Sequence, residues 1–499
     1  MINQHGGSSS LRENRCHIWP VKKDASRGKP LFNRRVYLIH TGAQQYRGRD
    51  VMKPLLLTNA LIISEDMRYQ ADILIDKGRI QKIASFIPSR PEWLVIDVRG
   101  KWVIPGMIDD QVHFREPGLT HKGTIATESA AAVMGGITSF MEMPNVTPPT
   151  TTRQALREKF QRASRSSLAN HSFYFGATND NLDELKALTA SQACGVKVFM
   201  GASTGNMLVD DEQVLESIFA NAPCLVATHC EHTPTIKQNE AIWRARFGDA
   251  IPPGEHAAIR SVDACLTSSR QAVSLAKKHR TRLHVLHITT ADELVLFDAA
   301  PTLEALRQKT ITAEACVHHL FFNYDDYETL GHKLKCNPSV KTSFHQEALW
   351  KGVNEGIIDV IATDHAPHLL EEKQSDYFAA PSGLPLVQHA LPALLDMCSR
   401  GIFTPEMVVR KTSHAVAERF QLKDRGYIRE GYWADLVVID PFSHQQIIRE
   451  DVAYKCGWSP FEGRILSGGA VDMTLVNGHV IWNGHTIQQK YGLPLEFCR

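Results

Sequence analysis

Short apolar runs alternate with helix-compatible stretches through the middle of the chain, from about residue 105 to residue 424. The strand candidates are 102–113, 136–143, 172–176, 196–200, 225–229, 283–287, 312–316 and 360–364. Stretches such as 153–167 and 261–278 lie between them and suit helices. Eight strands that alternate with helices are typical of a (β/α)8 TIM-type barrel, an α/β fold whose active site lies at the carboxyl ends of the strands. Functional side chains are therefore expected where each apolar run stops.

Both ends of the chain show strand signals of a different kind. Residues 55–63, 71–75 and 80–83 are short apolar runs, and a Lys77-Gly78 turn connects the last two. Residues 433–440, 473–476 and 479–482 show the same pattern, with a turn at Asn477-Gly478. Such turns favour β-hairpins. We therefore predict a small composite β-sandwich domain from 53–104 plus 425–499, around a barrel of residues 105–424.

Composition excludes several classes of protein. The net charge of the chain is +1, and residues 1–51 carry ten Lys or Arg against three Asp or Glu, so the remainder is near −6. This balance gives no reason to expect a nucleic-acid partner. There is no apolar run of 18 or more residues to span a membrane, and the first 30 residues lack the apolar core of a secretory signal. The ten scattered cysteines suit reduced thiols and a cytoplasmic location.

Residues 1–52 form an N-terminal extension that we expect to be disordered, because it is polar and lacks apolar periodicity. An upstream extension from an early start codon, a tail with a role of its own and a transit peptide are the interpretations left open.

Residues that can bind metals lie at the ends of the barrel strand candidates. These are His113, Lys197, His229, His287 and Asp364. A lone histidine is more often an ordinary polar residue, Lys197 alone could pair with an acid, and Asp364 alone could cap a helix. The joint pattern indicates a metal site, because all five fall at barrel-strand positions, in an order along the chain that suits a shared site.

Lys197 fits this site only after chemical modification. A protonated ammonium is costly to bury and has no lone pair for a metal. If carbon dioxide adds to the neutral amine, the carbamate is an anionic oxygen ligand that can bridge two cations. Imidazoles with two anionic oxygen groups suit zinc or a similar metal.

Gln111 stands where a His-x-His pair would place its first imidazole. On a strand, residues 111 and 113 point the same way, so Gln111 faces whatever His113 reaches. An amide oxygen is a weaker, neutral ligand. The first half of a familiar metal pair is therefore absent from this chain.

Several segments make the chain resemble the dihydroorotases of the amidohydrolase superfamily, in their long barrel-plus-sandwich form. They are Pro105-Gly106-Met107-Ile108-Asp109, His113-Phe114-Arg115-Glu116-Pro117-Gly118, Met143-Pro144-Asn145, Gly195-Val196-Lys197-Val198-Phe199, Thr312-Ala313-Glu314, Cys336-Asn337-Pro338 and Ala362-Thr363-Asp364-His365-Ala366-Pro367-His368. The resemblance covers about residues 55–480 and implies the same barrel with a β-sandwich built from both ends.

The resemblance implies a reaction: interconversion of L-dihydroorotate and N-carbamoyl-L-aspartate in pyrimidine synthesis, by a metal-bound hydroxide with Asp364 as general acid and base. It implies that carbamylated Lys197, His229 and His287 hold one metal ion. His113, Lys197 and Asp364 remain at the second position. We therefore expect one tightly bound Zn2+, with the second site weak or empty because of Gln111.

The substrate carries a carboxylate, and the planar fork of Arg115 suits it. By resemblance, Asn145 and His368 complete the carboxylate site and Asn337 contacts the ring, although either asparagine could be an ordinary turn residue. The segment 380–383 is expected to add backbone contacts. The resemblance also implies a homodimer or larger homo-oligomer.

Two alternatives stay open at this stage. The chain could be a hydantoinase, dihydropyrimidinase or allantoinase, which act on cyclic amides without this ring carboxylate and have less use for Arg115. It could instead be a non-catalytic dihydroorotase-like partner of aspartate transcarbamoylase.

Overall fold

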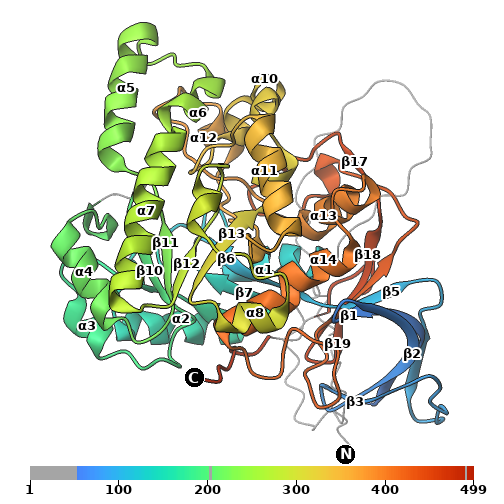
Figure 1. The fold of residues 1–499 in the computed structure, drawn as a ribbon. Coiled ribbons are helices and arrows are strands. Elements are labelled where there is room, and N and C mark those ends of the chain that lie inside the picture. Colours follow the sequence, from blue (N-terminus) through green and yellow to red (C-terminus); the bar gives the residue numbers. More distant parts are fainter. Residues whose placement is uncertain (1–52, 202–204, 489–491) are drawn as a thin grey trace, which may run out of the picture. The chain divides into compact units, whose positions relative to one another are not determined.

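Parallel strands form the barrel at the centre of the fold (Figure 1). The computed structural model describes residues 53–201, 205–488 and 492–499, so the expected extension 1–52 lies outside the described residues. The barrel strands are β6 (Met107–Val112), β7 (Ile137–Glu142), β8 (Asn170–Phe173) with β9 (Phe175–Gly176), β10 (Val196–Phe199), β11 (Val226–His229), β12 (Leu283–Val285), β13 (Ile311–Cys316) and β14 (Val360–Ala362). Each pairs with its neighbour in parallel.

The barrel closes between its first and last strands. Val112 forms a parallel bridge with His365, and the His113 backbone N–H donates to the His365 carbonyl at 2.7 Å. This closure brings the end of β6, with His113, beside the end of β14, with Asp364.

Helices cover the outside of the barrel (Figure 1). They are α1 (Ile125–Met134), α2 (Arg153–Ser166), α3 (Leu182–Lys186), α4 (Glu212–Asn221), α5 (Thr233–Phe247), α6 (His256–Ile259), α7 (Val262–His279), α8 (Leu303–Gln308), α9 (Val317–Phe321), α10 (Tyr327–Leu330), α11 (Ser343–Asn354), α12 (Leu370–Lys373), α13 (Ala390–Ser399), α14 (Pro405–Val409) and α15 (Ala415–Phe420). The two stretches expected as helices, 153–167 and 261–278, are α2 and α7 to within one residue at each end. Their first turns are capped by side chains, since Thr152 accepts from Ala155 N and Ser261 accepts from Ala264 N.

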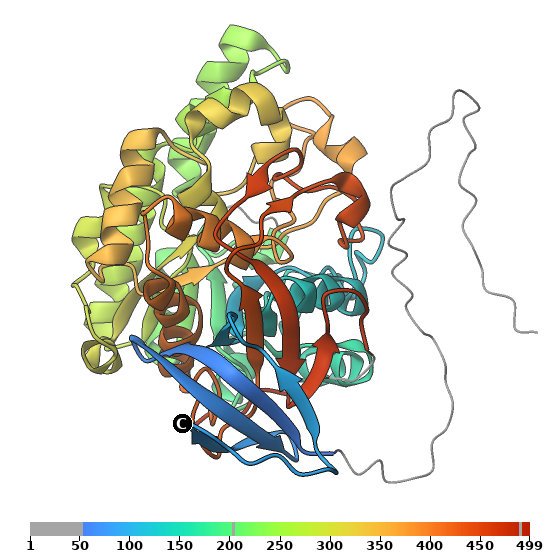
Figure 2. The ribbon, with the colours of Figure 1, turned by 90° about the vertical axis from the view of Figure 1, so that its right-hand side faces the viewer.

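The second domain is an eight-stranded mixed sheet that both chain ends build. Its strands are β1 (Leu55–Ser64), β2 (Met67–Asp76), β3 (Arg79–Ala84), β4 (Leu94–Asp97), β5 (Trp102–Pro105), β15 (Leu436–Asp440), β18 (Ala470–Val476) and β19 (His479–Trp482). The order is β19-β18-β15-β5-β1-β2-β3, with β4 beside β1. Figure 2 shows the blue N-terminal strands and the red C-terminal strands in this arrangement. The predicted fold class, a barrel with a small β domain from both ends, is confirmed.

One predicted strand is in fact two. The run 102–113 divides at Gly106 into β5 of the mixed sheet and β6 of the barrel. Gly106 N donates to Asp435 O at 2.9 Å, and a Cβ at Gly106 would lie 2.2 Å from the Thr138 side chain. Only glycine fits where the chain passes from one sheet to the other.

Both predicted hairpin turns are present, and they pack against each other. Lys77 and Gly78 have φ of 51° and 80°, and Asn477 and Gly478 have φ of 50° and 75°. Two successive residues with positive φ are the signature of the tight hairpin turn that suits the twist of a sheet. A Cβ at Gly478 would lie 2.7 Å from the Gly78 Cα, so glycine is required at this contact.

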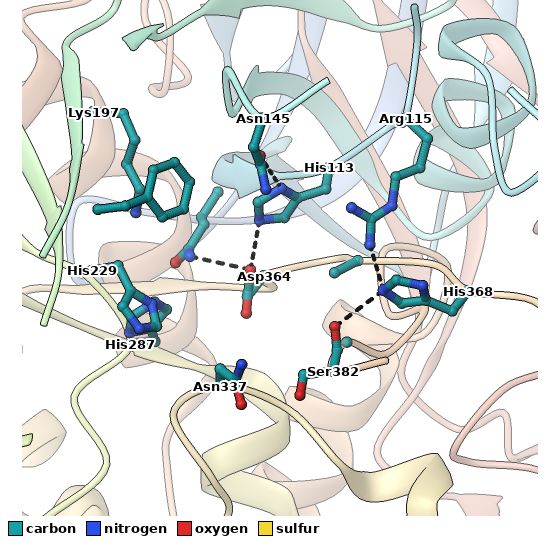
Figure 3. Close-up of a pocket in the computed structure, with 14 residues that line it drawn as sticks. His113, Arg115, Asn145, Lys197, His229, His287, Asn337, Asp364, His368 and Ser382 are labelled. Carbon is teal, nitrogen blue, oxygen red and sulfur yellow. Dashed lines mark hydrogen bonds and ion pairs between the residues drawn. The ribbon is translucent and has the colours of Figure 1, made fainter. Parts of the chain in front are cut away.

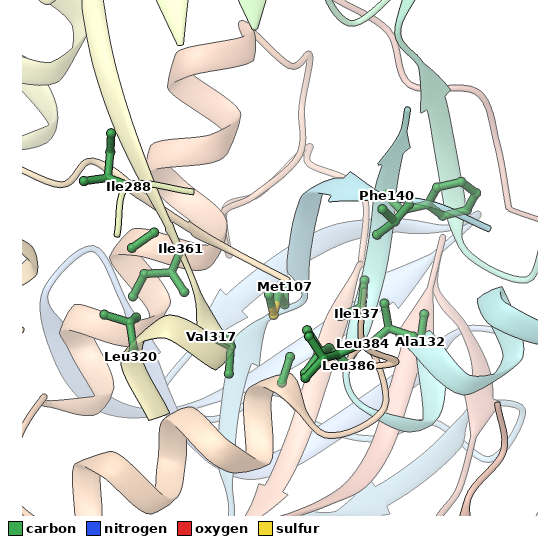
Figure 4. Packing of buried hydrophobic residues seen from close by; sticks show 14 of the residues in the cluster. Met107, Ala132, Ile137, Phe140, Ile288, Val317, Leu320, Ile361, Leu384 and Leu386 are labelled. Atoms are coloured by element: carbon green, nitrogen blue, oxygen red, sulfur yellow. The ribbon is translucent and has the colours of Figure 1, made fainter. Parts of the chain in front are cut away.

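Apolar side chains from β6, β7, β13, β14 and the surrounding helices form the largest core (Figure 4). Met107, Ile137, Phe140 and Ile361 are fully buried there. A separate apolar cluster, including Leu57, lies under the mixed sheet. These cores hold the barrel strands rigidly, which fixes the positions of the side chains at their ends. In the part of the chain that the structure describes, no helix is both long and apolar enough to cross a bilayer.

Candidate active site

The side chains predicted for the site surround one cavity of about 230 Å³ at the carboxyl ends of the barrel strands (Figure 3). The predicted residues that line it are His113, Arg115, Asn145, Lys197, His229, His287, Asn337, Asp364 and His368. Gln111, Phe199, Ala366, Ser382 and Gly383 complete the wall. The structure therefore brings together every residue of the predicted site, together with two residues of the 380–383 segment.

Three of these residues have unusual backbone conformations. Arg115, His287 and Asp364 have φ of 71°, 38° and 51°. A residue with a side chain adopts this left-handed region at a cost of about 1–3 kcal/mol, and such residues concentrate at functional sites. The strand ends thus turn sharply where they present these side chains to the cavity.

His229 and His287 face each other across one side of the cavity. The distance from His229 Nδ1 to His287 Nε2 is 2.9 Å. Burial lowers the pKa of both imidazoles, so both are neutral. His229 Nε2 lies 2.8 Å from a carboxylate oxygen of Glu231. Burial raises the pKa of Glu231, but Arg260 and His229 outweigh it and hold the pKa at about 2. The ionised Glu231 accepts a hydrogen bond from Nε2–H, which leaves the Nδ1 lone pair of His229 directed toward His287.

Lys197 lies on β10, and its Nζ is 4.5 Å from the centre of the Phe199 ring. Its side chain is almost fully buried. Burial lowers the pKa of Lys197 to about 8, although the negative charges of Asp364 and Glu314 act to raise it. The lowered pKa increases the fraction of neutral amine at neutral pH.

Asp364 contacts both His113 and Gln111 in the cavity. Its Oδ1 is 3.1 Å from His113 Nε2 and 3.2 Å from Gln111 Nε2. Burial raises the pKa of Asp364, but contact with His113 outweighs it, so the pKa is lowered overall. The other nitrogen of His113, Nδ1, lies 2.8 Å from Asn145 Oδ1 and donates to it. The His113 ring is thus held between an amide oxygen and a carboxylate.

The donor set fits a cation. His287 Nδ1 is buried without a hydrogen-bond partner among the described residues, and the Asp364 carboxylate lines the same cavity. Neutral imidazoles and carboxylates are ligands that zinc prefers. The orientation of His229 by a carboxylate is the arrangement that fixes metal-binding histidines in other proteins.

The opposite end of the cavity is positively charged. Arg115 Nε donates to Pro367 O at 3.0 Å, and its Nη2 lies 2.9 Å from His368 Nε2. Burial lowers the pKa of Arg115 only to about 10, so the guanidinium stays charged. Asn337 Oδ1 is buried and has no hydrogen-bond partner within the described residues. This end of the cavity can hold an anionic group of a small molecule.

Sequence reasoning missed other polar groups around the site. Glu231 lies two residues after His229, a spacing that could have identified it. Lys122 contacts His368 from a loop, and no strand periodicity predicts it.

Two buried groups also bring possible metal ligands within 4.8 Å of one another, namely Cys316 with His318 and His319, and Asp110 with His284 and Glu314. In the second group His284 Nε2 lies 3.2 Å and 3.3 Å from the two carboxylates, so charge pairing alone accounts for it.

Comparisons with known proteins agree with this geometry. The family model described as "Dihydro-orotase-like" matches residues 100–243, and the "Amidohydrolase family" model matches residues 256–481. A dihydroorotase of Methanosarcina acetivorans is 33% identical over 448 residues, which is 88% of this chain and 94% of that protein. A dihydroorotase of Halobacterium salinarum is 35% identical, over 83% of this chain and 94% of that protein. An allantoinase of Solibacter usitatus is 33% identical, over 85% of this chain and 92% of that protein.

Among solved structures, an L-hydantoinase of Arthrobacter aurescens is similar, with a TM-score of 0.83 and 26% identity. The match covers 89% of this chain and all of that one. A D-hydantoinase of a Thermus species, with 24% identity and a TM-score of 0.77, shares the fold. The chain therefore belongs to the amidohydrolase family and, within it, to the dihydroorotase-like proteins.

Proposed function

We propose that this protein is a dihydroorotase, which opens and closes the cyclic amide of L-dihydroorotate. The observation that carries the proposal is the pair Arg115 and His368, which converge at 2.9 Å on the side of the cavity away from His229 and His287. Dihydroorotate has a carboxylate on its ring, and a charged guanidinium beside an imidazole is suited to hold it. The ring amide would then face the histidines and Asp364.

Lys197, His229 and His287 would hold one zinc ion. When bound, zinc supplies Lewis acidity that polarises the ring carbonyl and makes water more acidic. The role of Lys197 requires carbamylation. Its neutral amine attacks carbon dioxide, an N–C bond forms and one proton is released, which leaves an anionic carbamate. The lowered pKa of Lys197 supports this step, because only the neutral amine reacts.

Asp364 would act as the general base and then as the general acid. In ring opening it takes a proton from the attacking water, whose oxygen bonds to the ring carbonyl carbon. The carbon–nitrogen bond then breaks, and Asp364 returns the proton to the departing nitrogen. The pKa of Asp364 is lowered, so the carboxylate is ionised at neutral pH and ready to accept.

The other polar side chains would orient the substrate. Asn145 holds His113 by accepting a hydrogen bond from its Nδ1. The Asn145 amide would also contact the carboxylate of the substrate. The free Asn337 Oδ1 is suited to accept from a ring N–H. Ser382 and Gly383 would add backbone contacts.

The test is ring opening of dihydroorotate, measured beside hydantoin and allantoin with the same preparation. We expect dihydroorotate to be the preferred substrate by at least tenfold in kcat/KM, and Asp364→Ala to abolish its turnover. Comparable turnover of hydantoin or allantoin would favour the second candidate, which the allantoinase relative and the L-hydantoinase structure support. Absence of turnover in the unmutated, zinc-loaded protein would favour a non-catalytic partner of aspartate transcarbamoylase.

The oligomeric state and location belong to the same proposal. Dihydroorotase function supports a cytoplasmic homodimer or larger assembly. Sedimentation equilibrium of the full chain, alone and with aspartate transcarbamoylase, tests both associations.

A further inference from the structure

Lys122 lies in the loop between β6 and α1, and its ammonium group reaches the substrate end of the cavity. Lys122 Nζ is 2.9 Å from His368 Nδ1 and 2.9 Å from Glu372 Oε1. Its side chain is 13% exposed, so the contact is largely shielded from water. Lys122 is not among the residues that line the cavity, and His368 is the lining residue that it contacts.

The contacts of His368 with Lys122, Ser382 and Arg115 bear on which of its ring nitrogens carries the proton. An ammonium group has three donors and no acceptor, so the Nδ1 atom that it contacts must supply a lone pair. Burial lowers the pKa of His368, and the charges of Arg115 and Lys122 lower it further, so the ring is neutral. A neutral ring without a proton on Nδ1 has it on Nε2. The Ser382 carbonyl, 3.1 Å from Nε2, can accept a hydrogen bond from this N–H, and a bound carboxylate would share it or take its place.

The same Nε2 atom lies 2.9 Å from Arg115 Nη2. A guanidinium nitrogen has no lone pair to offer, so this contact alone would favour a lone pair on Nε2, whereas the contacts of Lys122 and the Ser382 carbonyl both favour the proton there. With the proton on Nε2, the Arg115 and His368 donors face each other without a hydrogen bond between them. Two donors that converge on one point form a cradle for an anion. If the proton moved to Nδ1, Nε2 would accept from Arg115, so the contact would use one Arg115 donor and leave His368 without a donor at Nε2.

We propose that Lys122 is a positioning residue that keeps the proton of His368 on Nε2, so that His368 and Arg115 both donate to the substrate carboxylate. The part that concerns the carboxylate rests on the proposed function. The part that concerns the proton rests on the contacts of Lys122, His368 and Arg115 alone.

The variants that test this role are Lys122→Leu and Lys122→Arg. Leucine fills part of the space without a donor, whereas arginine restores a permanent donor toward Nδ1. Lys423→Leu is a control for the loss of an ion-paired lysine, because Lys423 pairs with Glu496 at the surface and neither residue lines the cavity. We expect Lys122→Leu to raise the KM for dihydroorotate by 10-fold to 100-fold, with kcat within threefold of the parent. Lys122→Arg should recover most of this loss, and Lys423→Leu should have no effect.

A second measurement does not depend on turnover. Nitrogen-15 NMR of histidine-labelled protein distinguishes a ring protonated on Nε2 from one protonated on Nδ1, and His368→Gln identifies the signal. We expect the Nε2–H form in the parent and in Lys122→Arg, and the Nδ1–H form in Lys122→Leu. The Nε2–H form in Lys122→Leu, or the Nδ1–H form in the parent, would overturn the proposal.

The two measurements separate the possible failures. If the parent protein does not turn over dihydroorotate, the proposed function fails, while the NMR result still decides the role of Lys122. If Lys122→Leu shifts the proton but leaves KM unchanged, the carboxylate part of the proposal is wrong. A fall in kcat with unchanged KM and unchanged NMR signal would indicate a merely structural role.

Discussion

Gln111 and His113 both contact the same oxygen of Asp364, at 3.2 Å and 3.1 Å. The two side chains thus share one face of β6, as the alternation of a strand requires. Gln111 occupies the position from which a second imidazole would reach a metal ion bound beside Asp364. Its amide nitrogen donates to Asp364, and its Oε1 lies 3.7 Å from Cys316 Sγ.

The first prediction follows from this contact. The parent protein should bind one zinc ion tightly, and Gln111→His should bind two, because an imidazole replaces a weak amide ligand. Elemental analysis after dialysis against a mild chelator measures the stoichiometry. Gln111→Asn, which shortens the amide without adding a ligand, is the control and should retain one. Two tightly bound zinc ions in the parent would contradict the prediction.

The second prediction concerns Lys197. Lys197→Met should lower tightly bound zinc below half an equivalent and lower kcat by at least about 1000-fold, because the carbamate ligand cannot form. Lys411→Met is a matched control, since Lys411 is also buried with its pKa lowered to about 8 by burial, but lies outside the cavity. Its zinc content should equal that of the parent. Refolding the parent without carbon dioxide should reproduce the Lys197→Met result, and added bicarbonate should reverse it.

The third prediction concerns Arg115. Arg115→Met should lower kcat/KM for dihydroorotate by about 100-fold to 1000-fold, which is the loss of a charged hydrogen bond of roughly 3–4 kcal/mol. Turnover of a cyclic amide without a carboxylate should change by less than threefold. Steady-state kinetics with both substrates tests this, and an equal loss for both would show that Arg115 supports the fold rather than the carboxylate.

The sequence predicted the barrel strands, because residues that can bind metals stand where the apolar runs end. His229 ends β11 as predicted, and the run 360–364 contains β14 and Asp364. The division of 102–113 at Gly106 was missed, although the Pro105-Gly106 pair is a typical signal for a break in a strand. The contact with Thr138 shows why glycine is needed there.

Contacts made by loops were also beyond sequence reasoning. Lys122 and His368 are 246 residues apart, and neither lies on a strand. Their contact depends on the path of two loops, which has no periodic signal. Glu231 differs, because it follows His229 by two residues and alternation would have placed both on one face.

The last prediction concerns the dependence of stability on pH. His389 is buried, and its Nδ1 lies 3.1 Å from the Tyr454 hydroxyl and 3.0 Å from Ser459 Oγ. Burial lowers its pKa from 6.5 to about 3. Above pH 6.5 the group is neutral in both the folded and unfolded states and has no effect. Below pH 6.5 the unfolded chain binds a proton that the folded protein cannot bind until about pH 3, so stability falls as the pH falls.

The size of this effect can be measured. The loss is about 1.4 kcal/mol per pH unit, or about 2 kcal/mol between pH 7 and pH 5. His389→Asn keeps a polar atom near Tyr454 and Ser459 but does not titrate, so its unfolding free energy should fall by about 2 kcal/mol less than that of the parent over this range. Urea unfolding of the chelated proteins at both pH values tests this, with the exposed His485→Asn as the control that should follow the parent. Parallel losses in the parent and in His389→Asn would mean that His389 takes up its proton in the folded protein as readily as in the unfolded chain.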